Sequence, residues 1–399
     1  MLKKNYLLKT QFKALFIALL LFQFSYSQNF TTVDKWLDNN IKDLGGRAVI
    51  LIYKDRKIIY TKEKNEVNRK QKMGAKWLKR KTGKEINLDD FTVDTKQPIA
   101  SCSKWLTAAL VMTFVDEKKL SLEDTIGKYL PIMTAHHKGS IKIWQCLSHL
   151  TGIKQTGVMD NIVDGEDGEN SKGKVNWRDK LKDRSNNQST NKVNSWTSMD
   201  AAMVCIANDT IEGVAGKIFH YGNTGLQIAA AIIEKIGHKD FETLFQERIV
   251  QQLEMKSTDF GKTKMPLAAG GAWSTPNDYI KFLQMILNEG MFNGKQVISK
   301  NSIIEMQQNR VAKDATIVYS PAEAGDWSYG FGEWVMDKAT PNNRSDIVTS
   351  PGLFGTFPWV DNNQKYAAIL FTVNIKSKGR HERYNTLKKL VDDAIRIKN

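Results

Sequence analysis

The sequence predicts an α/β fold of the α+β kind, in which an antiparallel sheet is flanked by helices and carries an inserted helical lobe. Strand-like segments lie near both ends of the chain, at 46–60 and 329–373, whereas the signal from 101 to 250 is mainly helical. Distant strands bury their apolar faces by completing one sheet. Without a predicted N-terminal segment of 27 residues, described below, 372 of the 399 residues remain, which suits one large domain with two lobes, or two small domains. We expect the helical lobe to occupy about 105–250.

The first 27 residues predict a secretory signal peptide. Four lysines within the first 13 residues precede a short apolar run at 14–22 and a small-x-small cleavage site at 25–27. The run is short for a membrane-spanning helix, and an uncleaved N-terminal anchor is the alternative. The mature domain is therefore expected to cover 28–399 and to be periplasmic or secreted.

A basic insert follows the first strands. Of the formal net charge of +15, eight positive side chains lie between Arg69 and Lys84, with no acidic residue among them. The simple interpretation is a solvated insert between strands. The alternative is contact with an anionic surface, such as a cell-wall polymer or lipid headgroups. Nucleic acid is not an expected partner behind a signal peptide.

The other elements follow from apolar runs and the residues that end them. Residues 46–53, a polar turn at 54–56 and residues 57–60 predict a β-hairpin. Residues 157–195 are polar and lack periodicity, which indicates a long loop that borders a site or stays mobile. Further helices and strands are predicted from the same signals. The helices are 143–148, 226–236, 278–289 and one from about 386, and the strands are 332–336, 354–360 and 366–373.

Cysteine and histidine give no sign of a disulfide framework or a metal site. Cys102, Cys146 and Cys205 are odd in number and each lies in an apolar helical context, so we expect buried free thiols. The six histidines are spread thinly, and the adjacent pair at 136–137 lacks a His-Glu-x-x-His context. We therefore expect neither a metal nor an organic cofactor.

A Ser-x-x-Lys tetrad, Ser101 to Lys104, opens the most hydrophobic helix-like run of the mature chain. A spacing of three on a helix places both side chains on one face. The run to Val115 is apolar almost all round and is expected to be buried. Burial disfavours the ammonium ion, so Lys104 can act as a base toward a nucleophilic Ser101. The helix N-terminus also suits a developing oxyanion.

Two more segments carry candidate site residues. Tyr221 and Asn223 lie two residues apart in a turn before an apolar helix, where both can face one cleft. A phenol beside an ammonium can be partly ionised and can pass a proton to a leaving group. Ser350 and Gly352 precede a strand, and a glycine at a strand edge lets substrate approach the backbone. A backbone N–H there is a candidate second oxyanion donor beside that of Ser101.

Six ordered blocks resemble the serine β-lactamase and penicillin-binding-protein superfamily, and most closely its class C-like branch with esterases, D-aminopeptidases and small amide hydrolases. The resemblance runs from about Thr32 to about Leu390 and implies a β-lactamase/transpeptidase-like fold. The blocks are Ile99–Trp105, Leu120–Pro131, Leu147–Ile153, His220–Gly225, Ala269–Asp278 and Tyr329–Gly332.

The resemblance implies roles for the matching residues. Ser101 resembles the acylated nucleophile and Lys104 the general base that activates it. Tyr221 resembles the residue that protonates the leaving group, and Asn223 the residue that orients Lys104 and the substrate. Ser350 and Gly352 are expected to bind substrate. The block containing His149 resembles a structural segment, to which no chemistry is assigned.

One motif departs from the superfamily pattern. A Lys-Thr-Gly or His-x-Gly motif is expected on the strand just before Gly352, but residues 346–351 hold neither lysine nor histidine. The literal Lys-Thr-Gly at 81–83 precedes Ser101 and is out of order. The missing cation would bind the carboxylate of β-lactams and of D-alanyl peptides, and Arg344 is a candidate substitute. The departure favours an esterase or amidase over an efficient β-lactamase.

The sequence thus predicts an exported serine hydrolase that acts on an ester or amide through an acyl-enzyme on Ser101. Its substrate is a small molecule or a peptide, with β-lactams and D-amino-acid peptides among the candidates. The alternative is a penicillin-binding-like binding or sensory protein with little turnover. A wall-attached structural protein held by residues 69–84 is a third interpretation. The oligomeric state is left open.

Overall fold

The computed structural model describes residues 29–83, 88–154, 196–263, 265–337 and 343–396. The predicted signal peptide at 1–27 lies outside the described residues, as does the predicted loop at 157–195. Within the described ranges, no helix is both long and apolar enough to span a membrane.

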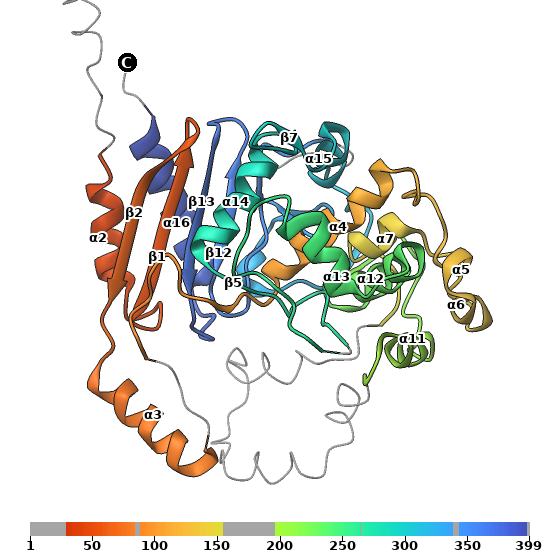
Figure 1. Ribbon diagram of the computed structural model, residues 1–399, viewed down its shortest axis with the longest axis horizontal. Helices are drawn as coiled ribbons and strands as arrows, with labels where there is room; N and C mark the ends of the chain where they lie inside the picture. The colour runs from red at the N-terminus through yellow and green to blue at the C-terminus, as the bar shows by residue number, and fades with distance from the viewer. Residues whose placement is uncertain (1–28, 84–87, 155–195, 264, 338–342, 397–399) are drawn as a thin grey trace, which may run out of the picture.

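A seven-stranded sheet in the order β2-β1-β13-β12-β11-β10-β9 forms one side of the molecule (Figure 1). All the pairings within it are antiparallel, and β1 from the start of the chain lies against β13 from its end, with Ala48 opposite Thr372. The predicted fold class is confirmed. The strands are β1 (Arg47–Lys54), β2 (Lys57–Asn65), β9 (Ser328–Tyr329), β10 (Trp334–Val335), β11 (Ile347–Thr349), β12 (Phe357–Asp361) and β13 (Tyr366–Thr372).

Both faces of this sheet are covered. Side chains alternate between faces along a strand, and in β1 Val49 and Leu51 join one apolar cluster while Ile50 and Ile52 join another. Helices α2 (Thr31–Asn40) and α16 (Arg380–Ile395) contact each other on the outer face. On the inner face α14 (Pro276–Leu287) contacts β1, β12 and β13, and the remaining helices lie beyond it (Figure 1).

The nucleophile helix α4 (Cys102–Asp116) lies at the centre of the helical part, and every residue from Cys102 to Phe114 is buried. The burial predicted from its apolar residues on every side is therefore confirmed. Neighbouring helices include α12 (Thr224–Gly237) and α7 (Ile143–Leu147), which pack against each other. The other helices are α5 (Ile126–Tyr129), α6 (Pro131–Ala135), α11 (Met199–Ala207), α13 (Phe241–Phe245) with η2 (Gln246–Val250), α15 (Lys300–Met306) and the turn η3 (Ala322–Ala324).

Short strand pairs hold the loops that build the site. β3 (Gln97–Pro98) pairs with β5 (Trp273–Ser274) just before α4, and β4 (Ile218–His220) pairs in parallel with β8 (Thr316–Tyr319) just before Tyr221. A third small sheet joins β6 (Met291–Phe292) to β7 (Lys295–Gln296).

Three local expectations change. The basic insert, expected to be a solvated segment between strands, contains a helix, α3 (Arg69–Thr82), which was not predicted. The last helix starts at Arg380 instead of about 386. Cys102 and Cys146 are buried as expected, whereas Cys205 is half-buried. The insert has a helical composition of lysine, arginine, alanine and leucine, which favours this conformation.

Candidate active site

The backbone bends sharply just before the candidate nucleophile. Ala100 has φ of 46°, in the left-handed region, and Ser101 follows in the right-handed helical region as the residue that precedes α4. A left-handed alanine costs about 1–2 kcal/mol, so the surrounding contacts must hold it in place. Strained residues of this kind cluster at functional sites. Ser101 is buried, with 6% of its surface exposed.

Lys104 lies one helical turn beyond Ser101 on the same face. Its Nζ is 3.1 Å from Ser101 Oγ, 3.2 Å from Asn223 Oδ1 and 2.9 Å from the carbonyl oxygen of Ala269. These three partners are uncharged, and only 1% of Lys104 is exposed. Burial lowers the pKa of Lys104 to about 7, against an ordinary value of 10.5. Near neutral pH a large fraction of Lys104 is therefore the free amine, which can accept a proton.

Tyr221 is brought to the same place by the end of β4. Its backbone N–H donates to the carbonyl of Tyr319, and its ring lies 4.8 Å from Lys104 Nζ, measured to the ring centroid. Its hydroxyl is hydrogen-bonded to the Ser101 side chain. Burial raises the pKa of Tyr221 above its ordinary value, and the bond to Ser101 opposes this only in part. The expectation of a partly ionised phenol is therefore wrong, because desolvation keeps the phenol neutral.

Aromatic side chains fix the Tyr221 ring. His149 packs edge-on against it at 4.7 Å between centroids, and Trp334 lies at 5.1 Å. His149 Nε2 is 3.1 Å from the hydroxyl of Tyr329, which also packs against Trp334. Burial lowers the pKa of His149 well below its ordinary value, and the nearby Lys104 lowers it further. His149 is thus a neutral ring that positions Tyr221. No side-chain pattern in the sequence indicated this contact.

A loop that sequence reasoning did not assign to the site supplies the carbonyl of Ala269. Two hydrogen bonds join this loop to the first turns of α4. Thr107 Oγ1 donates to the carbonyl of Ala268 at 2.6 Å, and the N–H of Ala272 donates to Ser103 Oγ at 3.0 Å. Asn223 comes from the opposite side, as the residue that precedes α12. Every residue type has a backbone carbonyl, so the identity of residue 269 does not indicate this contact. The resemblance block at 269–278 was the one sequence feature that could have indicated it.

Ser350 and Gly352 lie beside the nucleophile, but their polar groups are used within the fold. Ser350 Oγ is 2.9 Å from the carbonyl oxygen of Gly332 and 3.3 Å from that of Ser101. The N–H of Gly352 donates to the carbonyl of Thr356 at 2.8 Å. A Cβ at Gly352 would collide with the carbonyl of Ile99, so glycine permits this close approach. Gly352 is therefore a packing residue whose N–H cannot also bind an oxyanion.

Two backbone N–H groups near this contact are available. Among the residues that the structure describes, neither Ser101 N–H nor Leu353 N–H donates a hydrogen bond. Ser101 N–H stands at the start of α4, where helix N–H groups are unsatisfied. Leu353 directly follows Gly352. Together they are the better candidates for a pair of oxyanion donors.

Arg344 does not replace the missing cation. Its Nε donates to Gln307 Oε1 at 2.8 Å, and its Nη1 is 3.4 Å from Glu289 Oε1. Its charge is thus already paired. Lys81 belongs to α3 and not to a strand of the sheet, so the literal Lys-Thr-Gly is a chance match.

Gly332→Ala is expected to disturb the site through a clash with α4. Gly332 has φ of 72°, and a Cβ there would lie 2.5 Å from the carbonyl oxygen of Lys104 and 2.7 Å from Ala108 Cβ. We expect a loss of about 2 kcal/mol or more in the free energy of unfolding. Gly294→Ala is the matched control, because Gly294 has φ of 78° but nothing near its Cβ position. Chemical denaturation measures both. Equal losses would show that the clash with α4 does not matter.

A family model described as Beta-lactamase matches residues 37–392.

The chain belongs to the beta-lactamase family.

The family resemblance predicted from the six blocks is confirmed. Protein Rv1367c of Mycobacterium tuberculosis is 23% identical over 314 residues, which cover 67% of this chain and 72% of the relative. Among solved structures, a beta-lactamase candidate from Bacteroides dorei is 23% identical with a TM-score of 0.70, over 92% of this chain and 99% of its own. EstCE1, a hydrolase with promiscuous acyltransferase activity, is 15% identical with a TM-score of 0.61, over 92% and 100%. At these identities the solved structures show that this beta-lactamase family member shares their fold.

Proposed function

We propose that this beta-lactamase family member is an exported serine hydrolase that cleaves an ester or amide through an acyl-enzyme on Ser101. One observation carries the proposal: a fully buried lysine whose pKa is about 7 lies 3.1 Å from a serine hydroxyl, with no carboxylate as partner. A lysine whose only purpose was to stabilise the fold would be expected to pair with an acid, because an unpaired buried amine is costly.

Acylation begins with the free amine of Lys104. Nζ takes the proton of Ser101 while Oγ bonds to the substrate carbonyl carbon, and the carbonyl oxygen becomes an oxyanion. The N–H groups of Ser101 and Leu353 are the proposed donors to that oxyanion. Each such donor typically contributes about 10²–10³ in rate.

The intermediate then expels its leaving group. Tyr221 is a neutral phenol beside Ser101, so it can give its proton to the departing alcohol or amine. The proton that Lys104 has taken restores the phenol. Water attacks the acyl carbon in the second half-reaction, its proton passes to Lys104, and Ser101 leaves as the protonated hydroxyl.

The substrate class follows from a missing charge. No lysine or histidine stands on β11 or in the residues up to Gly352, and Arg344 is paired with Glu289. A substrate with a free carboxylate would therefore lack its usual cationic partner. This favours neutral esters and amides over β-lactams and D-alanyl peptides.

The test is covalent labelling of the mature protein with a fluorophosphonate, located by peptide mass spectrometry. Wild type and Ser101→Ala are compared, with hydrolysis of a short p-nitrophenyl ester and of nitrocefin measured in parallel. We expect a label on Ser101, ester turnover, and little nitrocefin turnover. Fast nitrocefin turnover would restore the β-lactamase assignment. Absence of any label would favour the binding or sensory protein.

Export is proposed from residues 1–27 alone. Expression with the natural N-terminus in a bacterial host, followed by N-terminal mass analysis of the extracytoplasmic fraction, tests it. We expect a chain that begins at Gln28. A full-length chain in the cytoplasm would contradict export without touching the hydrolase proposal.

The pH dependence of kcat/KM should report the titration of Lys104. The free enzyme needs the neutral amine, so the rate should rise with pH to a plateau, with the midpoint at about 7. Asn223→Asp places a carboxylate where Oδ1 now lies 3.2 Å from Nζ. An opposite charge this close raises a lysine pKa by about 1–3 units, so the rising limb should move to higher pH. A limb that stays in place in this variant would show that Lys104 is not the titrating base.

A further inference from the structure

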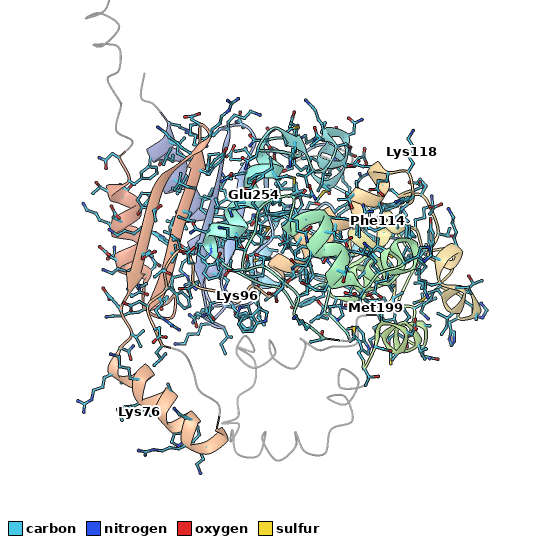
Figure 2. All side chains as sticks on the ribbon, viewed as in Figure 1. Lys76, Lys96, Phe114, Lys118, Met199 and Glu254 are labelled. Atoms are coloured by element: carbon cyan, nitrogen blue, oxygen red, sulfur yellow. The ribbon has the colours of Figure 1, made fainter. Side chains whose placement is uncertain are left out.

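Helix α3 (Arg69–Thr82) is separated from the packed body of the protein. Figure 1 shows it at the lower left, beyond the end of β2 and apart from both the sheet and the helical part. In Figure 2 the labelled Lys76 lies on this helix, apart from the packed body. A helix of 14 residues without tertiary packing is marginal in water by itself. Its composition therefore needs an explanation other than core formation.

The charge on α3 is of one sign. It carries seven lysine and arginine residues and no acidic residue. Apart from Lys79, none of these cations forms an ion pair with a described residue. The six are Arg69, Lys70, Lys72, Lys76, Arg80 and Lys81. An isolated cluster of this kind attracts an anionic surface over roughly a Debye length, about 8–10 Å at physiological salt.

Two large apolar side chains are exposed between these cations. Met73 is 61% exposed and Trp77 is 57% exposed. Their spacing of four residues places them in one row on the helix. The row of Lys72, Lys76 and Arg80 runs along one side of it. Helical geometry puts Lys70 and Lys81 on its other side. A narrow apolar stripe with cationic borders is typical of a helix that lies in a bilayer interface.

The basic surface continues at the root of the helix. A hollow of about 360 Å³ is lined by Lys42, Gly45, Asn68, Lys70, Asn374 and Lys376. Its three lysines come from three separate segments, and none forms an ion pair within the described part of the chain. Phosphate groups beneath α3 would thus meet lysine ammonium groups of the body as well as those of the helix.

We propose that α3 docks this protein onto a bilayer surface that contains anionic phospholipids. The charge would draw the helix to the phosphates, and Met73 and Trp77 would enter the headgroup region. A soluble acidic polymer such as a cell-wall polyanion would satisfy the charge but would give no comparable burial to the two apolar side chains. The helix lies on the membrane and does not cross it, because 14 residues span only about 21 Å of a core about 30 Å thick.

Vesicle flotation of the mature full-length chain tests the proposal. The vesicles are pure phosphatidylcholine, or phosphatidylcholine with 30% phosphatidylglycerol, at 150 and 500 mM salt. One variant removes the stripe (Met73→Ser with Trp77→Ser), and another reverses charge (Lys72→Glu, Lys76→Glu and Arg80→Glu). The matched control reverses three exposed lysines elsewhere: Lys35→Glu, Lys118→Glu and Lys256→Glu. Melting temperatures verify that every variant folds.

We expect wild type to float with the anionic vesicles only and to lose at least tenfold in partitioning at the higher salt. Charge reversal on α3 should lower partitioning onto the anionic vesicles tenfold or more, and removal of the apolar stripe should lower it about fivefold or more. The control variant should partition within about twofold to threefold of wild type. Equal partitioning of wild type and the α3 variants would overturn the proposal. If charge reversal lowered partitioning but stripe removal did not, the proposal would also be overturned, because α3 would then be a general site for polyanions. Neither outcome depends on hydrolase activity.

Discussion

Lys104→Met should abolish both fluorophosphonate labelling and ester turnover, with a fall of at least about 10³-fold in the acylation rate. Methionine has a similar length and apolar stem to lysine, so the buried space of the Lys104 side chain stays occupied. What disappears is the amine that lies 3.1 Å from Ser101 Oγ. Without it the serine hydroxyl has no base in reach, because the neighbouring Tyr221 is a neutral phenol whose pKa burial has raised.

A second buried lysine provides the control. Lys138 is 4% exposed, and its Nζ donates to the carbonyl of Ala207 at 2.7 Å. Lys138→Met therefore also removes a buried amine from backbone acceptors, but none of its partners belongs to the site. We expect Lys138→Met to keep labelling and turnover within about threefold of wild type once both proteins are verified to be folded. Retained labelling in Lys104→Met would show that another group activates Ser101.

Glu333→Gln should stabilise the protein increasingly as the pH rises. Glu333 directly follows Gly332, it is 0% exposed, and neither of its carboxyl oxygens has a hydrogen-bond partner in the described structure. Burial raises the pKa of Glu333 well above its ordinary value, and the charge of Arg344 opposes this only in part. At pH values between the unfolded and the folded pKa, the folded protein therefore holds a protonated carboxyl group that the unfolded chain would ionise.

The direction follows from proton binding. A carboxyl group with a raised pKa in the folded state contributes most to stability below its unfolded pKa of about 4.5, and that contribution falls as the pH rises. While the unfolded group is ionised and the folded one is protonated, the fall is at most about 1.4 kcal/mol per pH unit. Glutamine has no proton to lose, so the stability difference between Glu333→Gln and wild type should grow at up to this rate.

Urea denaturation at pH 5, 6 and 7 measures this difference. Glu382→Gln, a neutralisation of an exposed glutamate on α16, is the control and should show a nearly constant difference from wild type. A flat difference for Glu333→Gln as well would mean that Glu333 is ionised in the folded protein. Arg344, whose Nη2 has no hydrogen-bond partner among the described residues, would then be the first partner to examine.

The sequence by itself determined the family, the fold class and the main residues of the candidate site. Ser101 and Lys104 were predictable because a spacing of three on a helix fixes their side chains on one face whatever surrounds them. Burial of α4 was predictable because its residues are apolar on every side. Tyr221 and Asn223 were predictable as a pair because they share one short turn before an apolar helix. Their catalytic roles stay predictions until the labelling experiment is done.

Only the tertiary structure decided which polar groups are available at the site. The carbonyl of Ala269 reaches Lys104 across 165 positions of sequence, and every residue type has such a carbonyl. Gly352 N–H is used by Thr356, and Arg344 is paired with Glu289. The neutral state of Tyr221 and the lowered pKa of Lys104 likewise depend on the groups that exclude water from them. Hydrogen-bond partners and desolvation are properties of atoms brought together from distant segments, so a local pattern of residues does not contain them.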